Sequence, residues 1–74
     1  MKEKVYQIIS QLMEIPVASI SENSSGDDIV KWDSLKHMDL MMTLEEEFEI
    51  QFTDEEIVEL SDVKSILEAI KEHI

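Results

Sequence analysis

Hydrophobic residues recur along most of this chain at the spacing of an amphipathic helix. The first series consists of Val5, Ile8, Ile9, Leu12 and Met13. Its i, i+3, i+4, i+7, i+8 pattern places the side chains on one helix face and predicts a helix that ends before Pro16. The last series consists of Val63, Ile66, Leu67, Ile70 and Ile74. The alternation typical of a β-strand is not sustained anywhere, which favours an all-α fold.

Residues that cap helices predict where the other helices begin. The candidates are Asp33, Thr53 with Glu56 as a capping box, and Ser61 or Asp62. Their side chains can accept hydrogen bonds from the free amides of a first helical turn. We therefore expect a second helix over about residues 34–49, a short third helix through about Leu60, and a last helix after it. The predicted architecture is a four-helix bundle with a long first connection and a short third helix.

The first connection, residues 15–33, contains the only proline and the only glycine of the chain, Pro16 and Gly26. It is also rich in serine and asparagine, which favour turns. Its hydrophobic residues are Ile15, Val17, Ile20, Ile29, Val30 and Trp32. In a small domain with little other core material, a connection this long and hydrophobic is expected to pack against the bundle.

The predicted second helix has two hydrophobic faces. One face consists of Leu40, Met41, Leu44 and Phe48, and the other of Leu35, Met38 and Met42. A bundle helix needs one hydrophobic face for the core, and the first face fits that role. The second face is bordered by Asp39, Glu45, Glu46 and Glu49. An exposed apolar strip with an acidic border is typical of a protein-interaction surface, and the alternative is a bundle that buries both faces.

The length of 74 residues predicts one domain over residues 1–74, with too little material for a deep substrate cavity. There is no cysteine, and the two histidines, His37 and His73, are far apart in the sequence. We therefore predict neither an enzyme nor a metal site, and no twelve-residue calcium loop is present. No N-terminal signal and no apolar run of membrane-spanning length is found, which predicts a cytoplasmic protein without membrane insertion.

The net charge of −12 is concentrated in the middle of the chain. Residues 34–60 contain nine acidic residues and one lysine, a net charge of −8. Such a field repels nucleic acid and anionic membranes, and it accelerates encounters with basic patches on other proteins. A surface that only confers solubility is the alternative, but the concentration of charge favours partner docking.

Ser34 is the candidate for chemistry because it lies in the first turn of the predicted second helix. The free amides there favour an anion such as a phosphodiester. Ser34 could instead serve as a second capping hydroxyl. A nucleophilic serine assisted by His37 is disfavoured, because the chain has no GxSxG motif, no glycine-rich oxyanion loop and no third residue to orient the imidazole. On the helix His37 points with the core face, where a packed histidine touching the first connection is expected.

The residues around Ser34 resemble the acyl carrier protein family. They are Trp32-Asp33-Ser34-Leu35, followed by Met38-Asp39-Leu40 and by Leu44-Glu45-Glu46-Glu47-Phe48. The family includes carriers with a Trp-Asp-Ser-Leu-x-His pattern. The similarity extends over essentially the whole chain, from the amphipathic first helix to the last one, and it implies the four-helix bundle of that family.

The resemblance implies that a phosphopantetheinyl transferase attaches 4′-phosphopantetheine from coenzyme A to Ser34. The arm ends in a thiol that carries acyl groups as thioesters between enzymes of fatty acid, polyketide or specialised acyl-transfer pathways. The implied partners are acyl-loading and acyl-transferring enzymes with basic docking patches. The residues expected to contact them are Asp33, Leu35, Met38, Asp39, Met42, Glu45 and Glu46. We expect the carrier to be a monomer.

Three residues near Ser34 depart from the carriers of bacterial fatty acid synthesis. Lys36 stands where those carriers often have an acidic residue, and Trp32 and His37 are more similar to carriers of specialised pathways, such as polyketide synthesis or cell-surface glycan acylation. Two alternatives stay open. A stand-alone aminoacyl or peptidyl carrier would have the same arm and an amino-acid-adenylating partner, whereas an unmodified acidic adaptor would bind a basic partner through the second helix.

Overall fold

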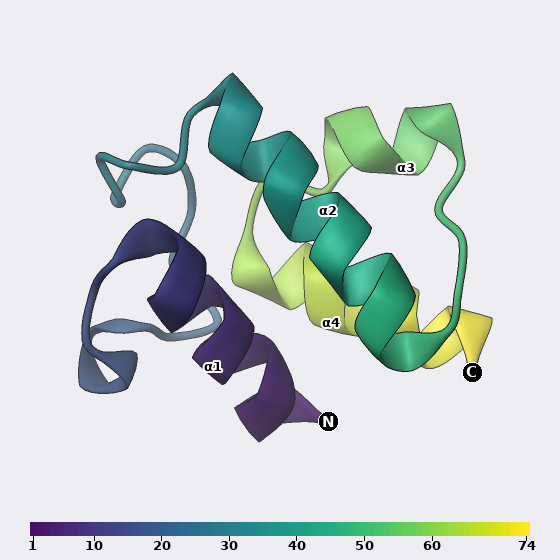
Figure 1. Cartoon of the computed structure of the whole chain (residues 1–74), viewed down its shortest axis with the longest axis horizontal. Coiled ribbons are helices and arrows are strands. Elements are labelled where there is room, and N and C mark those ends of the chain that lie inside the picture. Colours follow the sequence, from purple (N-terminus) through teal and green to yellow (C-terminus); the bar gives the residue numbers. More distant parts are fainter.

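The computed structural model describes all residues from Met1 to Ile74 and is helical. Its helices are α1 (Lys2–Met13), α2 (Ser34–Phe48), α3 (Asp54–Glu59) and α4 (Val63–His73), and a 3-10 helix, η1 (Val17–Ser19), lies in the first connection. In Figure 1, α2 crosses in front of α4, α1 lies beside α2, and α3 is on the other side of α2. The predicted all-α four-helix bundle is confirmed, with its long first connection and short third helix.

The predicted caps explain where α2 and α3 begin. Oδ1 of Asp33 accepts a hydrogen bond from the amide of Lys36 at 2.9 Å. Thr53 and Glu56 form a complete capping box, in which each side chain accepts a hydrogen bond from the other residue's amide, at 3.1 and 2.9 Å. These bonds satisfy amides that a helix start would otherwise leave free.

Asp62, and not Ser61, caps α4. Its Oδ1 accepts a hydrogen bond from the amide of Ser65 at 2.7 Å. Hydrogen bonds from Ser65 hold the pKa of Asp62 below its ordinary value. A carboxylate whose pKa is lowered by folding stabilises the native state above its unfolded pKa, about 3.9, and this contribution is lost as the pH falls through the folded value.

Replacing Asp62 with alanine is therefore expected to lower the free energy of unfolding by about 1 kcal/mol at neutral pH, measured by urea denaturation. Asp62→Asn is the matched control, because asparagine caps a helix as well as aspartate but has no charge to lose. The asparagine variant should match the wild type at neutral pH and lose less stability than the wild type on acidification below about pH 4. An equal loss in both variants at neutral pH would show that capping is not the contribution of Asp62.

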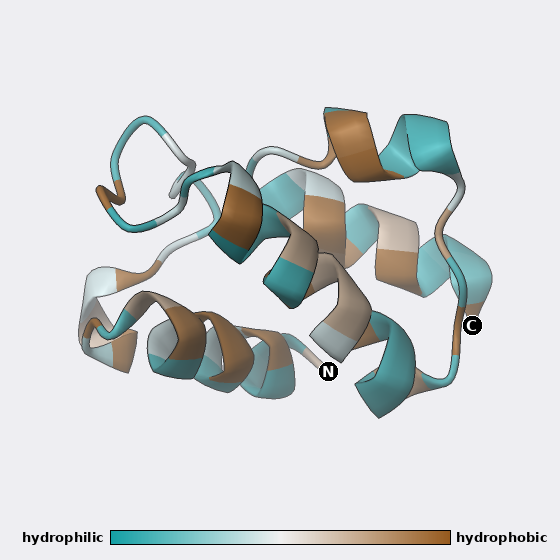
Figure 2. Cartoon of the chain, turned by 45° about the horizontal axis from the view of Figure 1, so that its top comes forward, coloured by the Kyte–Doolittle hydropathy of each residue, from teal (hydrophilic) through white to brown (hydrophobic).

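One hydrophobic core is shared by α1, α2, α4 and the first connection. Its buried residues are Val5, Ile8, Ile9, Met13, Ile20, Ile29, Trp32, Leu40, Met41, Leu44, Phe52, Leu60, Val63, Ile66, Leu67, Ala69 and Ile70. Figure 2 shows hydrophobic and hydrophilic bands alternating along the helices, as expected where each helix has one buried side. No residue of α3 itself is buried, and only the residues that flank it, Phe52 and Leu60, belong to the core.

The first connection is packed against the bundle, but the prediction was wrong for two of its residues. Ile20, Ile29 and Trp32 are buried, whereas Val17 is 44% exposed and Val30 is 96% exposed. Ile29 and Val30 are adjacent in the turns before α2, and the side chain of Ile29 takes the position toward the core, so Val30 points outward. Val17 begins the single surface turn of η1. No helix of the structure is both long and apolar enough to cross a membrane.

Candidate functional site

Ser34 is exposed and is the first residue of α2. Its hydroxyl makes no hydrogen bond within the chain, because Asp33 already provides the cap. The amides of Ser34 and Leu35 also donate to no other group of the chain. Two free amides at the positive end of a fifteen-residue helix stabilise negative charge placed beside them. The site therefore fits a phosphodiester formed on the Ser34 oxygen.

A groove of about 550 Å³ opens beside Ser34, between α2, α3 and the first connection. Its lining consists of Gly26, Asp27, Trp32, Asp33, Ser34, His37, Met38, Ile57, Val58 and Ser61. Apolar side chains from α2 and α3, among them Met38 and Val58, face this groove together with the polar groups near Ser34. An extended flexible chain attached to Ser34 has room to lie along it.

His37 is a packed residue that contacts the first connection, as expected from its position on the helix. The indole Nε1–H of Trp32 donates a hydrogen bond to Nδ1 of His37 at 2.9 Å. Because Nδ1 accepts, the ring proton is on Nε2, which donates to the carbonyl oxygen of Ile57 at 2.6 Å. Both nitrogens are therefore engaged away from Ser34, and neither is free to act as a general base for its hydroxyl.

The two hydrophobic faces of α2 have different environments. Leu40, Met41 and Leu44 are fully buried, and Phe48 packs against the core. On the other face, Leu35, Met38 and Met42 are 79%, 45% and 59% exposed. The alternative in which the bundle buries both faces is thus wrong. The second face is an apolar strip open to solvent, and it begins directly beside Ser34.

The acidic residues around this strip are not equivalent. Asp39 and Glu46 are exposed, and their carboxylates make no hydrogen bond or ion pair within the chain. Glu45 is only partly exposed, and its Oε2 accepts a hydrogen bond from the amide of Phe52 at 2.8 Å, which fixes the turn between α2 and α3. Asp33 is engaged as the cap of α2. Asp39 and Glu46 are therefore free charges of the strip, as is Glu49, which is exposed at the end of α2 and whose carboxylate has no partner in the chain.

The sequence interpretation missed the contribution of α3 to this site. Val58 is 79% exposed and lines the groove opposite Met38. The signal was the Ile57-Val58 pair between acidic residues in a predicted helix, but a six-residue helix is too short for a hydrophobic period to identify its faces. Val58 is exposed because of the way in which α3 packs against α2.

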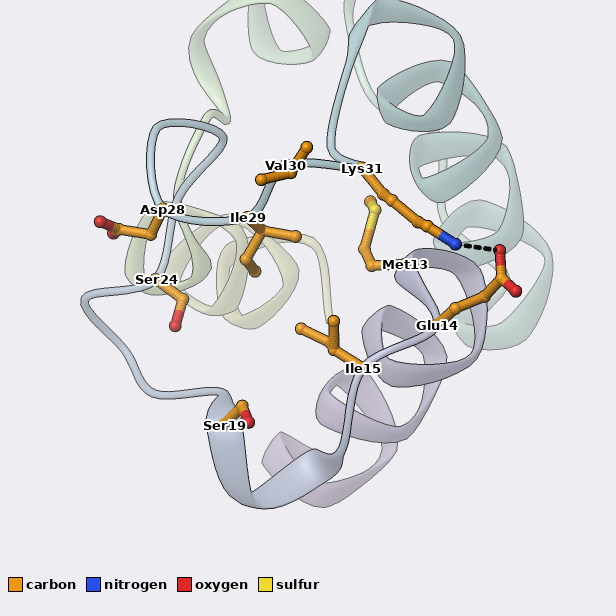
Figure 3. Close-up of a pocket in the computed structure, with 9 residues that line it drawn as sticks. All are labelled: Met13, Glu14, Ile15, Ser19, Ser24, Asp28, Ile29, Val30 and Lys31. Atoms are coloured by element: carbon orange, nitrogen blue, oxygen red, sulfur yellow. Dashed lines mark hydrogen bonds and ion pairs between the residues drawn. The ribbon is translucent and has the colours of Figure 1, made fainter.

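A second cavity, of about 390 Å³, lies between the end of α1 and the first connection, and none of the predicted site residues line it. Figure 3 shows Met13, Ile15 and Ile29 around its interior, with Lys31 reaching Glu14 at its rim. The Nζ of Lys31 is 2.8 Å from Oε2 of Glu14, and this hydrogen bond and the lysine charge lower the pKa of Glu14. The pair ties the first connection to the end of α1 and belongs to the fold, away from Ser34.

Comparisons with known proteins agree with this geometry. Residues 3–70 match the family model described as the phosphopantetheine attachment site. The acyl carrier protein of Clostridium acetobutylicum is 41% identical over 71 residues, which cover 96% of this chain and 92% of the relative. The acyl carrier protein of Buchnera aphidicola subsp. Schizaphis graminum is 36% identical over 69 residues, covering 93% of this chain and 87% of the relative.

A solved structure is similar over nearly the same range. The solution NMR structure of the holo acyl carrier protein from Geobacter metallireducens has a TM-score of 0.86 and 26% sequence identity, and the match covers 97% of this chain and 83% of that chain. The likeness therefore includes the first connection and the short α3, and not only the three longer helices.

Proposed function

The chain belongs to the acyl carrier protein family, and from that premise we propose that Ser34 carries its 4′-phosphopantetheine. Members of the family are carriers and not catalysts. The covalently attached arm supplies a terminal thiol, which holds acyl groups as thioesters while other enzymes act on them. The observation that carries the assignment is the exposed, unbonded hydroxyl of Ser34 at the start of α2.

The residues around Ser34 have separate roles in this proposal. The Ser34 oxygen forms the phosphodiester, and the amides of Ser34 and Leu35 stabilise its negative charge. Asp33 keeps the first turn of α2 in place by capping it at the amide of Lys36. The groove beside Ser34 gives the arm a partly apolar surface to rest on.

The family implies interaction with a phosphopantetheinyl transferase and with acyl-handling enzymes. We propose that these enzymes dock on the exposed strip of Leu35, Met38 and Met42, with basic patches facing Asp39 and Glu46. The apolar strip supports close contact, and the free carboxylates accelerate the encounter without holding the partner for long. Tethering then raises the effective concentration of the acyl group at each enzyme in turn.

We also propose that residues 1–74 act as a single carrier domain, because one core unites α1, α2 and α4, and that the carrier is a monomer. A cytoplasmic location stays a prediction from the sequence. The acyl carrier proteins among the relatives favour an acyl cargo over an aminoacyl one. Trp32, Lys36 and His37 favour a specialised pathway, whose enzymes would have to accept a lysine beside Ser34.

The test is enzymatic modification followed by mass spectrometry. The protein without its arm is incubated with coenzyme A and a broad-specificity phosphopantetheinyl transferase, then analysed intact and as peptides. We expect a mass gain of one phosphopantetheine per chain, located on the peptide that contains Ser34. No gain would support the unmodified adaptor, whereas a gain on another serine would keep the carrier function and overturn the assignment of Ser34.

A further inference from the structure

Both histidines of the chain hold α3 in place. No residue of α3 is fully buried and only Ile57 packs partly against the core, so this helix depends largely on contacts at its surface. From α2, Nε2 of His37 donates to the carbonyl oxygen of Ile57 at 2.6 Å. From α4, Nε2 of His73 lies 3.0 Å from the carboxylate oxygens of Glu56. One imidazole thus binds the backbone of α3 and the other binds a side chain.

The two imidazoles differ in the protonation state that they need. Nδ1 of His37 accepts from the indole of Trp32, with the two rings within 21° of parallel, and an acceptor nitrogen has no proton. The bond from Trp32 to His37 therefore requires the neutral ring, whereas Nε2–H can donate to Ile57 in either protonation state. His73 faces a carboxylate, so its contact is strengthened when the ring is charged.

We propose that His37 is a positioning residue that, in its neutral form, joins Trp32 to α3 across the groove beside Ser34, and that protonation breaks this bridge at Trp32. The role of His37 in positioning the arm rests on the proposed function of Ser34. The pH-dependent conformational change does not depend on that function. A proton from solvent adds to the lone pair of Nδ1, and no covalent bond of the chain breaks. The new N–H then faces the indole N–H of Trp32, and two donors cannot form a hydrogen bond.

The ring of His37 must then turn or move away from Trp32, and this disturbs its bond to Ile57. Ile57 and Val58 form the α3 side of the groove, and Trp32 forms part of the opposite side. Loss of the bond to Trp32 therefore ends the link between the two sides of the groove. Because acid strengthens the His73 contact with Glu56, the beginning of α3 stays attached while the ring of His37 shifts beside Ile57.

The charged groups around His37 are few. From the first connection, Asp27 and Asp33 line the same groove, and on α2 Lys36 directly precedes His37. On α3, Glu56 is bound to the amide of Thr53 and to His73, and these hydrogen bonds lower its pKa. No charged residue of α4 lines the groove. Glu56 therefore keeps its charge over the range in which imidazoles titrate, and loss of the Trp32 bond depends on His37 alone.

The test uses the single tryptophan of the chain as its reporter. The indole N–H signal of Trp32 and the ring signals of both histidines are followed by NMR in the protein without its arm, from about pH 8 to about pH 5. We expect the indole signal to shift with the same midpoint as the ring of His37. Amide hydrogen exchange at Ile57 and Val58, corrected for its intrinsic pH dependence, should become faster below that midpoint, and that of Ile8 should not.

Three variants separate the possible causes. His73→Asn should leave the titration of the indole signal unchanged. His37→Asn should remove it, because the asparagine oxygen can accept from Trp32 at every pH. Ser34→Ala should titrate like the wild type, so this result and the modification assay can fail independently. An indole signal that stays constant while His37 titrates, that loses its titration in His73→Asn, or that shifts without faster exchange at Ile57 and Val58 would overturn the proposal.

Discussion

Replacing Ser34 with alanine is expected to abolish attachment of phosphopantetheine completely while leaving the fold intact. The phosphodiester forms on the hydroxyl oxygen, so a residue without that oxygen cannot carry the arm. The same hydroxyl makes no hydrogen bond within the chain, and Asp33 keeps its cap on α2. The free energy of unfolding should therefore change by no more than about 0.5 kcal/mol, as for other surface substitutions. Intact mass after modification and urea denaturation measure the two quantities.

Ser61→Ala is the matched control for this experiment. Ser61 is also exposed, lines the same groove, and has a hydroxyl without a hydrogen bond in the chain. It differs from Ser34 in lying two residues before the start of α4, outside the first turn of that helix. The control should be modified as completely as the wild type. Modification of Ser34→Ala, or its absence from Ser61→Ala, would contradict the assignment of the arm to Ser34.

Local sequence signals predicted most of the fold. Asp33, Thr53 and Asp62 cap the helices because each side chain reaches an amide only three residues away, and such short contacts depend little on the rest of the chain. The hydrophobic faces of α2 were also readable from periodicity. The exposure of Val17 and Val30 was not, because in a loop without regular structure the direction of each side chain is decided by the surface against which the loop packs.

The local part of the site was also predictable from the sequence, whereas its long-range contacts were not. Ser34 could be identified from its position at a helix start and from the surrounding motif, and the structure adds that its hydroxyl is exposed. The contact of His37 with the first connection was predicted, but its bond to Ile57 could not be foreseen, since the two residues are 20 positions apart. The bond from Phe52 to Glu45 is similar: helical geometry placed Glu45 at the border of the strip, but only the turn after α2 determines that its carboxylate is engaged.

The second large effect is expected from a pair of neighbouring methionines that belong to opposite faces of α2. Met41 is fully buried, whereas Met42 is 59% exposed. Met41→Ala should lower the free energy of unfolding by about 2–5 kcal/mol, because it removes buried contacts and leaves a cavity that the core fills only in part. In a domain of this size, whose core supplies only about 3–5 kcal/mol, that loss is enough to unfold a large fraction of the molecules.

Met42→Ala controls for residue type, helix and size of the change, and it should alter stability by about 0.5 kcal/mol or less. Both variants keep Ser34 and its cap, so modification separates folding from docking. Met42→Ala should stay folded but be modified with a higher KM, since it removes part of the exposed strip, whereas Met41→Ala should lose modification only in proportion to its unfolded fraction. Equal urea midpoints for the two variants would mean that α2 does not present one face to the core and the other to partners.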